Sequence, residues 1–243
     1  MAKVTKAKFK TMHGVFDEFT NRTVWKLISQ GHIDGLIGPV SVGKESHVFA
    51  AQRGSEKAIV KIHRLETSDF NKMYDYIKFD PRFAGLQKKR RKVVFTWAQR
   101  EYRNLMNARS AGVSAPKPIT FFNNIVVMEF IGTREAAPML KDKIPANPKL
   151  FLNKIIENMR KLYKAGFVHS DLSSFNILNF NETPVLIDFS QCTPLENPHA
   201  EEYLERDIKN IANFFKRIGL KIEGEEIKKR IILFTGITHM VLI

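Results

Sequence analysis

Residues 167–189 read FVHSDLSSFNILNFNETPVLIDF, and this stretch decides the fold that we expect. It contains the spacing H-x-D-L-x-x-x-N from His169 to Asn176, and twelve residues later an apolar run ends in Asp188. Asp171 could accept or orient the proton of an incoming hydroxyl group. The Asn176 carbonyl oxygen and the Asp188 carboxylate are ligands that suit Mg²⁺. Together these residue types indicate the chemistry of phosphoryl transfer.

A cation upstream fits the same chemistry. Lys61 lies in AIVKI (58–62), which reads as a buried strand, and a buried ammonium group needs a partner. We expect Lys61 to contact the α and β phosphates of a nucleotide and to pair with Glu101, which lies in a helix predicted over residues 97–109. The alternative is an ordinary surface ion pair. His169 is expected to brace its loop rather than to exchange protons.

A glycine-containing loop precedes this strand. Residues 38–44 fit the pattern G-x4-GK, but a P-loop needs Ser or Thr next, followed by a helix. Here the next residue is Glu45, and HVFAAQ (47–52) is strand-like. We therefore disfavour a P-loop and expect a loop between antiparallel strands that lies over phosphates, with Ser41, Gly43 and Lys44 contacting ATP.

The remaining chain predicts an α+β protein with a β-rich front half and a helical back half. We expect helices over 23–30, 97–109, 150–165 and 200–217, and strands over 36–42, 47–52, 58–63, 125–130, 176–180 and 185–189. Pro116 and Pro118 indicate a loop. The predicted organisation is a basic arm (1–22), a first lobe (23–131) with a long, partly mobile basic insertion (64–95), and a second lobe (132–243).

Charge points to a phosphate-rich partner. Lys and Arg number 39 against 25 Asp and Glu, a formal net charge of +14. The densest run is KKRRK (88–92), which fits either a solvated loop or a contact to RNA or the ribosome. No aromatic residue interrupts the run, so it gives no support for sequence-specific reading of bases.

Nothing in the sequence predicts a membrane protein. No apolar run is long enough to span a bilayer, and residues 231–243 read as a buried strand or helix interrupted by polar residues. Residues 1–10 lack the apolar stretch of a secretory signal. The single cysteine, Cys192, excludes an internal disulfide. We expect an intracellular, cytoplasmic protein.

At these motifs the sequence resembles the RIO family of atypical serine/threonine protein kinases, most closely the first (Rio-one) branch in its archaeal or minimal form. The matching segments are SVGKESHVFAA (41–51), AIVKIHRLETSDF (58–70), TWAQREYRNL (96–105), VVMEFIG (126–132), FVHSDLSSFNIL (167–178), VLIDFSQ (185–191) and YLERDIKNI (203–211). The loop segment GKESHVF also resembles the second branch. The resemblance runs from about residue 23 to about residue 220 and implies a two-lobed, minimal protein-kinase-like fold.

The resemblance implies roles for individual residues. It implies ATP bound with Mg²⁺ (or Mn²⁺), with adenine held by the backbone around Glu129 and Ile131 and with Met128 behind it. Asp171 is implied as the catalytic base, and Asp188 as a metal ligand that can itself become phosphorylated. The resemblance also implies a role in maturation of the small ribosomal subunit, with its rRNA and proteins as partners, in which ATP hydrolysis matters more than protein phosphorylation.

Departures from ordinary protein kinases also carry predictions. HRD is replaced by His169-Ser170-Asp171, DFG by Asp188-Phe189-Ser190, and no APE motif follows. We therefore expect weak, poorly selective phosphorylation of free peptides, with autophosphorylation on serine and slow ATP turnover as the main outputs. Two alternatives stay open: an ATP-gated assembly factor whose turnover is incidental, and a kinase for a small molecule.

Overall fold

The computed structural model describes residues 16–232, and the chain divides into two compact units. The first unit runs to Tyr74 and also includes 86–102 and 118–130, whereas 75–85, 103–117 and the chain from Ile131 form the second. The sequence assigned 75–85 and 103–117 to the first lobe. They group with the second unit because contacts such as those of Asn104, whose amide donates to the Phe189 and Cys192 carbonyls at 2.9 and 2.8 Å, tie them to it.

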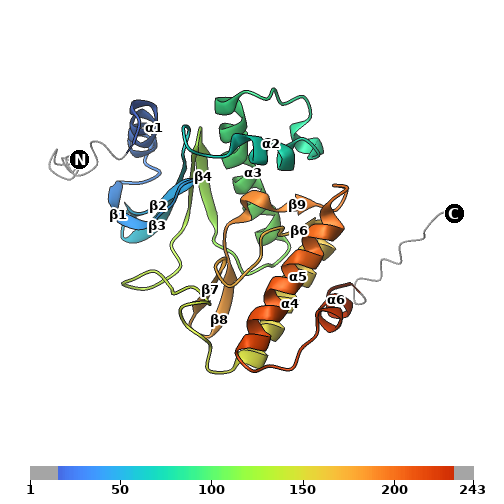
Figure 1. Ribbon diagram of the computed structural model, residues 1–243. Helices are drawn as coiled ribbons and strands as arrows, with labels where there is room; N and C mark the ends of the chain where they lie inside the picture. Colours follow the sequence, from blue (N-terminus) through green and yellow to red (C-terminus); the bar gives the residue numbers. More distant parts are fainter. Residues whose placement is uncertain (1–15, 233–243) are drawn as a thin grey trace. The chain divides into compact units, whose positions relative to one another are not determined.

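The first unit is built on an antiparallel sheet (Figure 1). Its strands lie in the order β1 (Gly35–Val42), β2 (Ser46–Arg53), β3 (Glu56–His63), β5 (Ile125–Glu129) and β4 (Pro118–Phe122). Four of these strands were predicted, but β4 was expected to be a loop because of its prolines. Pro118 is tolerated because it is the first residue of an edge strand, where a ladder does not need its missing N–H.

Helix α1 (Glu18–Ser29) packs on this sheet. Val24 and Leu27 on α1 join Val60 and Ile62 of β3 in one buried cluster. The helix begins five residues before the predicted start because Asp17 caps it, accepting a hydrogen bond from the Thr20 N–H at 2.8 Å. Part of the predicted basic arm is therefore helical, and its residues 1–15 lie outside the described residues.

About half of the predicted insertion (64–95) is helical, whereas the sequence suggested a long loop without regular structure. It contains α2 (Phe70–Ile77), the short 3-10 helix η1 (Pro81–Phe83) and the beginning of α3 (Arg90–Ser110). Two features explain why this segment has regular structure. Val93 and Val94 are fully buried and extend the apolar face of α3, and the Arg90 guanidinium donates to the carbonyls of Leu65, Glu66 and Ser68.

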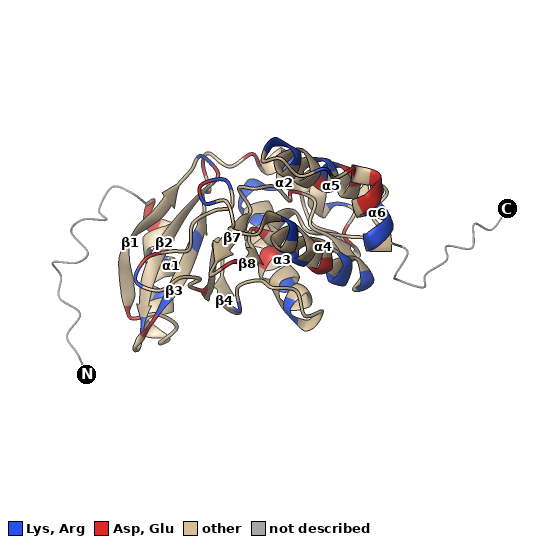
Figure 2. Cartoon of the chain, turned by 90° about the horizontal axis from the view of Figure 1, so that it is seen from below, with Lys and Arg blue, Asp and Glu red and all other residues tan. Residues whose placement is uncertain are grey.

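Three α-helices lie entirely within the second unit. These are α4 (Pro148–Lys164), α5 (Ala200–Arg217) and α6 (Gly224–Ile232), and α6 packs against both others. Charged residues of both signs lie at α6 (Figure 2), and Lys228 on this helix lies 2.6 Å from Glu201 and 3.0 Å from Glu205 of α5. The helices over α4 and α5 were predicted, whereas α6 was not. Of the predicted late element (231–243), only its first two residues are described, in α6.

Short strands complete the second unit. The hairpin β7 (Ile177–Phe180) and β8 (Thr183–Leu186) turns at Asn181 and Glu182, which both have positive φ. Strand β6 (Phe167–Val168) pairs with β9 (Thr193–Pro194), with the 3-10 helix η2 (Phe189–Gln191) just before β9. The second strand was expected to reach residue 189 but ends at Leu186. Among residues 16–232, no helix is long and apolar enough to cross a membrane.

Candidate active site

In the first unit, the predicted pair of Lys61 and Glu101 is present. Lys61 Nζ lies 2.8 Å from Glu101 Oε1, and the two side chains are 9% and 1% exposed. Strand neighbours point to opposite faces, so Val60 and Ile62 enter the core under α1 while Lys61 points to the other face. Glu101 reaches that face from α3.

The same carboxylate has a second partner that the sequence analysis did not identify. His63 Nε2 lies 2.8 Å from Glu101 Oε2, and His63 is buried. Because His63 stands two residues after Lys61 on β3, both side chains lie on one face of the strand. Glu101 is thus held by contacts to both of its oxygens. The sequence contains a sign of this contact, because in Lys61-Ile62-His63 the first and third side chains of a strand point to the same face.

The glycine loop joins β1 to β2 without a helix, which excludes a P-loop at this position. Gly43 N–H donates to the Ser46 carbonyl at 2.9 Å, and a Cβ at Gly43 would lie only 3.2 Å from that oxygen. Thr67 Oγ1 donates to the Lys44 carbonyl at 2.6 Å. Ser41 is exposed on β1. The loop therefore has a defined backbone shape that exposes its residues along the end of the β1–β2 hairpin.

The predicted adenine-contacting residues lie at the end of β5 and just after it. Met128 is buried on β5, and Glu129, the last residue of this strand, is exposed. Ile131 belongs to the second unit, where its carbonyl accepts a hydrogen bond from the Ala137 N–H at 2.9 Å. The predicted roles of these three residues in ATP binding stay predictions.

In the second unit, Asn176 and Asp171 contact each other directly. Asn176 Nδ2 donates to the Asp171 backbone carbonyl at 2.7 Å and to Asp171 Oδ2 at 3.1 Å. With its amide nitrogen on Asp171, Asn176 keeps its carbonyl oxygen for another ligand. The spacing of five residues thus forms a loop in which one residue orients the carboxylate of the other.

The backbone on either side of Asp171 is anchored by a buried carboxylate. Asp207, on α5, accepts hydrogen bonds from the N–H groups of Ser170 (2.8 Å) and Leu172 (2.7 Å). Ser170 has a φ of 68°, an uncommon value for a residue with a side chain, and Arg206 donates to its carbonyl. Burial raises the pKa of the Asp207 carboxyl to about 7, against the lowering effect of the two N–H bonds.

The sequence analysis assigned no role to Asp207 and Arg206, which lie in the segment YLERDIKNI (203–211). An aspartate on the buried face of an amphipathic helix, between Leu204 and Ile208, was the available signal. Its partners lie 37 and 35 residues earlier in the chain, so only the fold could identify them.

Asp188 lies between β8 and η2. It has a φ of 62°, and its Oδ1 accepts a hydrogen bond from Ser190 Oγ at 2.6 Å. The Ile187 N–H donates to the backbone carbonyl of Asn176 at 3.0 Å. The residue before Asp188 is therefore bound to the backbone of the other predicted metal ligand. His169 is buried, with Nε2 3.1 Å from the Ile187 carbonyl and its ring 4.8 Å from that of Phe189. These contacts fit the bracing role expected for His169.

The donor set fits magnesium. The Asn176 carbonyl oxygen and the Asp188 carboxylate are hard oxygen ligands, as Mg²⁺ requires. Within residues 16–232, no group of three or more His, Cys, Asp or Glu side chains is arranged to hold a metal ion. A cation bound by one or two side chains and completed by phosphate oxygens and water agrees with both observations.

Comparison with known proteins gives the family. A family model described as RIO domain matches residues 47–228. The Haloferax volcanii "RIO-type serine/threonine-protein kinase Rio1" is 40% identical over 222 residues, covering 90% of this chain and 77% of that protein. The Methanocaldococcus jannaschii Rio1 kinase is 42% identical over 210 residues, covering 86% and 72%. The Homo sapiens kinase RIO1 is 36% identical over 220 residues, but this chain spans only 39% of its length.

Solved structures agree on the fold. The Rio2 kinase of Chaetomium thermophilum, crystallised as an ADP/Mg²⁺-phosphoaspartate complex, aligns with a TM-score of 0.64 over 86% of this chain and 65% of its own. The identity is 22%, so this likeness supports the kinase-like α+β fold and not the roles of single residues. The predicted fold class is confirmed.

Proposed function

Because the chain belongs to the RIO family of serine/threonine-protein kinases, we propose that it uses Mg-ATP to phosphorylate itself and hydrolyse ATP during maturation of the small ribosomal subunit. The observation that carries the catalytic part is the contact of Asn176 with Asp171 on a loop anchored by Asp207. The ribosomal part is supported by the net charge of +14, which suits an RNA-rich partner.

We assign nucleotide binding chiefly to the first unit. Lys61 contacts the α and β phosphates, and Glu101 holds its ammonium group in place. The loop with Ser41, Gly43 and Lys44 lies over the phosphates. Adenine is recognised by the backbone from Glu129 to Ile131 with Met128 behind it. Because the Ile131 carbonyl already accepts from Ala137, its N–H is the group we assign to adenine.

We assign proton handling and metal binding to the second unit. Asp171 orients the acceptor hydroxyl and receives its proton, and the amide of Asn176 fixes the direction of the Asp171 carboxylate. Asn176 Oδ1 and Asp188 would hold Mg²⁺ or Mn²⁺, which supplies charge neutralisation of the phosphates. Asp207 is a positioning residue, since it holds the backbone on both sides of Asp171.

Asp188 is also our candidate phosphoacceptor. The Chaetomium thermophilum Rio2 complex contains ADP, Mg²⁺ and a phosphoaspartate. The equivalent step here forms a bond between an Asp188 carboxylate oxygen and the γ-phosphorus, while the bond from that phosphorus to the departing ADP oxygen breaks. Water then hydrolyses the acyl phosphate, and the sum of both steps is ATP hydrolysis.

The test compares wild type with Asp171→Ala and Asp188→Ala, and uses Asp142→Ala as the matched control. Asp142 is an exposed aspartate of the same unit that pairs with Lys141. We expect ATP turnover and incorporation of labelled γ-phosphate to fall at least about 100-fold in the two site variants and to stay unchanged in the control. Label lost on treatment with hydroxylamine, and absent from Asp188→Ala, identifies the acyl phosphate.

Small-subunit precursor particles are added in a second arm. Stimulation of turnover by these particles supports the ribosomal role. Tight ATP binding, with wild-type turnover no higher than that of the variants, would overturn the enzyme assignment and leave an ATP-gated assembly factor.

A further inference from the structure

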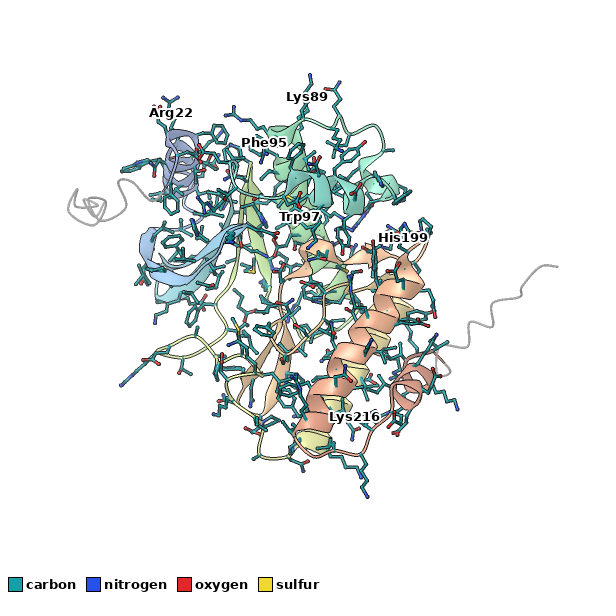
Figure 3. The ribbon with its side chains drawn as sticks, viewed as in Figure 1. Arg22, Lys89, Phe95, Trp97, His199 and Lys216 are labelled. Atoms are coloured by element: carbon teal, nitrogen blue, oxygen red, sulfur yellow. The ribbon has the colours of Figure 1, made fainter. Side chains whose placement is uncertain are left out.

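A run of five exposed cations stands at the start of α3. Lys88 and Lys89 precede the helix and residues 90–92 form its first turn, and all five side chains are exposed. Figure 3 shows Lys89 pointing outward from this end of the helix. Arg90 has a structural task, because its guanidinium binds three carbonyls of the preceding segment. The other four cations need a different explanation.

Helix stability does not explain these cations. The N-terminal end of a helix carries partial positive charge, so cations there are unfavourable. Helices α2, α3 and α4 have no acidic residue in the first turn, and α3 differs from the other two in having three consecutive cations there, at residues 90–92. An anionic partner would offset this repulsion.

Aromatic rings lie against the same cations, brought there from other parts of the chain. Lys88 Nζ lies 5.4 Å from the Tyr74 ring centroid, and the Arg91 guanidinium carbon lies 4.6 Å from that of Phe19. Phe19 stacks on Phe95 with centroids 5.4 Å apart and planes at 17°. All three aromatic residues are half-buried. The run itself contains no aromatic residue, and only the fold adds them.

We propose that this basic–aromatic surface binds single-stranded RNA. It consists of Phe19, Tyr74, Lys88, Lys89, Arg91, Lys92 and Phe95, all in the first unit. Cations suit phosphates, and rings suit unpaired bases, which stack on aromatic side chains with little sequence preference. A duplex hides its bases and would have no use for the rings. Only the identification of the RNA as ribosomal rests on the proposed function.

The test measures binding of a labelled 12-nucleotide oligouridylate, without ATP, over a series of salt concentrations. The variant Lys88→Gln/Lys89→Gln/Lys92→Gln should bind at least about tenfold more weakly. Its slope of log K against log salt should be shallower by about 2, since each lost phosphate contact removes about 0.7. The matched control is Lys209→Gln/Lys221→Gln/Lys229→Gln, three exposed lysines of the second unit that remove the same charge.

A ring variant separates RNA binding from simple attraction of anions. Tyr74→Leu should weaken oligouridylate binding about fivefold or more, because one stacked base is worth at least about that factor. It should leave binding of inorganic polyphosphate unchanged, whereas the lysine variant weakens both. Thermal unfolding midpoints of all variants are measured alongside, and the lysine variant should be at least as stable as wild type.

Three results would overturn the proposal. They are equal oligouridylate binding by the lysine variant and wild type, no effect of Tyr74→Leu, and preferential binding of a 12-base-pair RNA duplex or of phosphatidylserine vesicles. Because the assay contains no ATP, its outcome does not depend on the catalytic residues. Particles that fail to stimulate turnover, with RNA binding intact, would count against the ribosomal role alone.

Discussion

The candidate site residues of the two units are held in different ways. In the first unit, Glu101 contacts Lys61 and His63 through side chains alone, and all three are buried. In the second unit, the loop around Asp171 is held through its backbone, whose N–H groups donate to the carboxylate of Asp207. The first set relies on a buried ion pair and the second on a buried carboxylate with backbone partners.

This difference predicts how chemistry and stability are coupled. In the first unit the cation assigned to the phosphates, Lys61, is itself part of the buried network, so a change that affects chemistry also affects folding. In the second unit, proton transfer is assigned to Asp171, whereas the loop is held by hydrogen bonds to Asp207. There, the two properties should be separable by mutation.

The largest expected effect is that of Glu101→Ala. It leaves the Lys61 ammonium buried without its carboxylate and removes a partner of His63, which should lower the free energy of unfolding by about 3–5 kcal/mol. Turnover of ATP should fall at least about 100-fold, because Lys61 loses its orientation. Urea denaturation followed by circular dichroism gives the first value, and labelled ATP gives the second.

A double variant tests the stability and the activity of the first unit separately. Lys61→Met/Glu101→Leu replaces the ion pair by apolar side chains of similar size, which is often neutral or stabilising. We expect it to recover most of the lost stability and none of the activity. Recovery of activity together with stability would contradict the assignment of Lys61 to the phosphates.

An intermediate effect is expected from Asp207→Ala. The buried N–H groups of Ser170 and Leu172 lose their acceptor, and leaving each unpaired costs about 1 kcal/mol or more, so about 2 kcal/mol of stability should be lost. The turnover number should fall while KM for ATP stays nearly constant, because the residues that we assign to the phosphates, Lys61 and the glycine loop, belong to the other unit. Asp171→Ala is the matched comparison and should lose turnover with little change in stability. A rise in KM alone after Asp207→Ala would argue against a positioning role.

The elements with strong periodicity could be predicted from the sequence. Strands β1, β2, β3 and β5 alternate or form short apolar runs, and α4 and α5 have clear apolar faces. The missed elements depend on contacts that local patterns do not contain. The segment after β3 is ordered by Arg90, a residue about 25 positions away, and the basic run looked like a loop although Lys and Arg are good helix formers.

The candidate site also contains residues that the sequence predicts and a residue that only the fold identifies. Lys61, Asp171, Asn176 and Asp188 stand at spacings that sequence alone can display, and the pairing of Lys61 with Glu101 is present in the structure. Asp207 was missed because its partners are the N–H groups of Ser170 and Leu172, and backbone groups carry no sequence signal. The residues to which we assign chemistry could be identified from the sequence, whereas the proposed positioning residue was identified from the fold.

The last expected effect is a pH dependence that reports on Asp207. Burial raises its pKa to about 7 from the ordinary 3.8, although Arg206 nearby lowers it. Between these values the folded protein holds a proton that the unfolded chain has released, so this group makes stability fall as pH rises. The slope is at most about 1.4 kcal/mol per pH unit, and it vanishes above pH 7. Asp207→Asn should remove it, so the difference in unfolding free energy between wild type and variant should change from pH 5 to pH 7 and stay constant from pH 7.5 to 8.5. Parallel curves across the whole range would mean that Asp207 is ionised throughout. In that case the two N–H bonds outweigh burial, and the loop around Asp171 is held by a charged carboxylate.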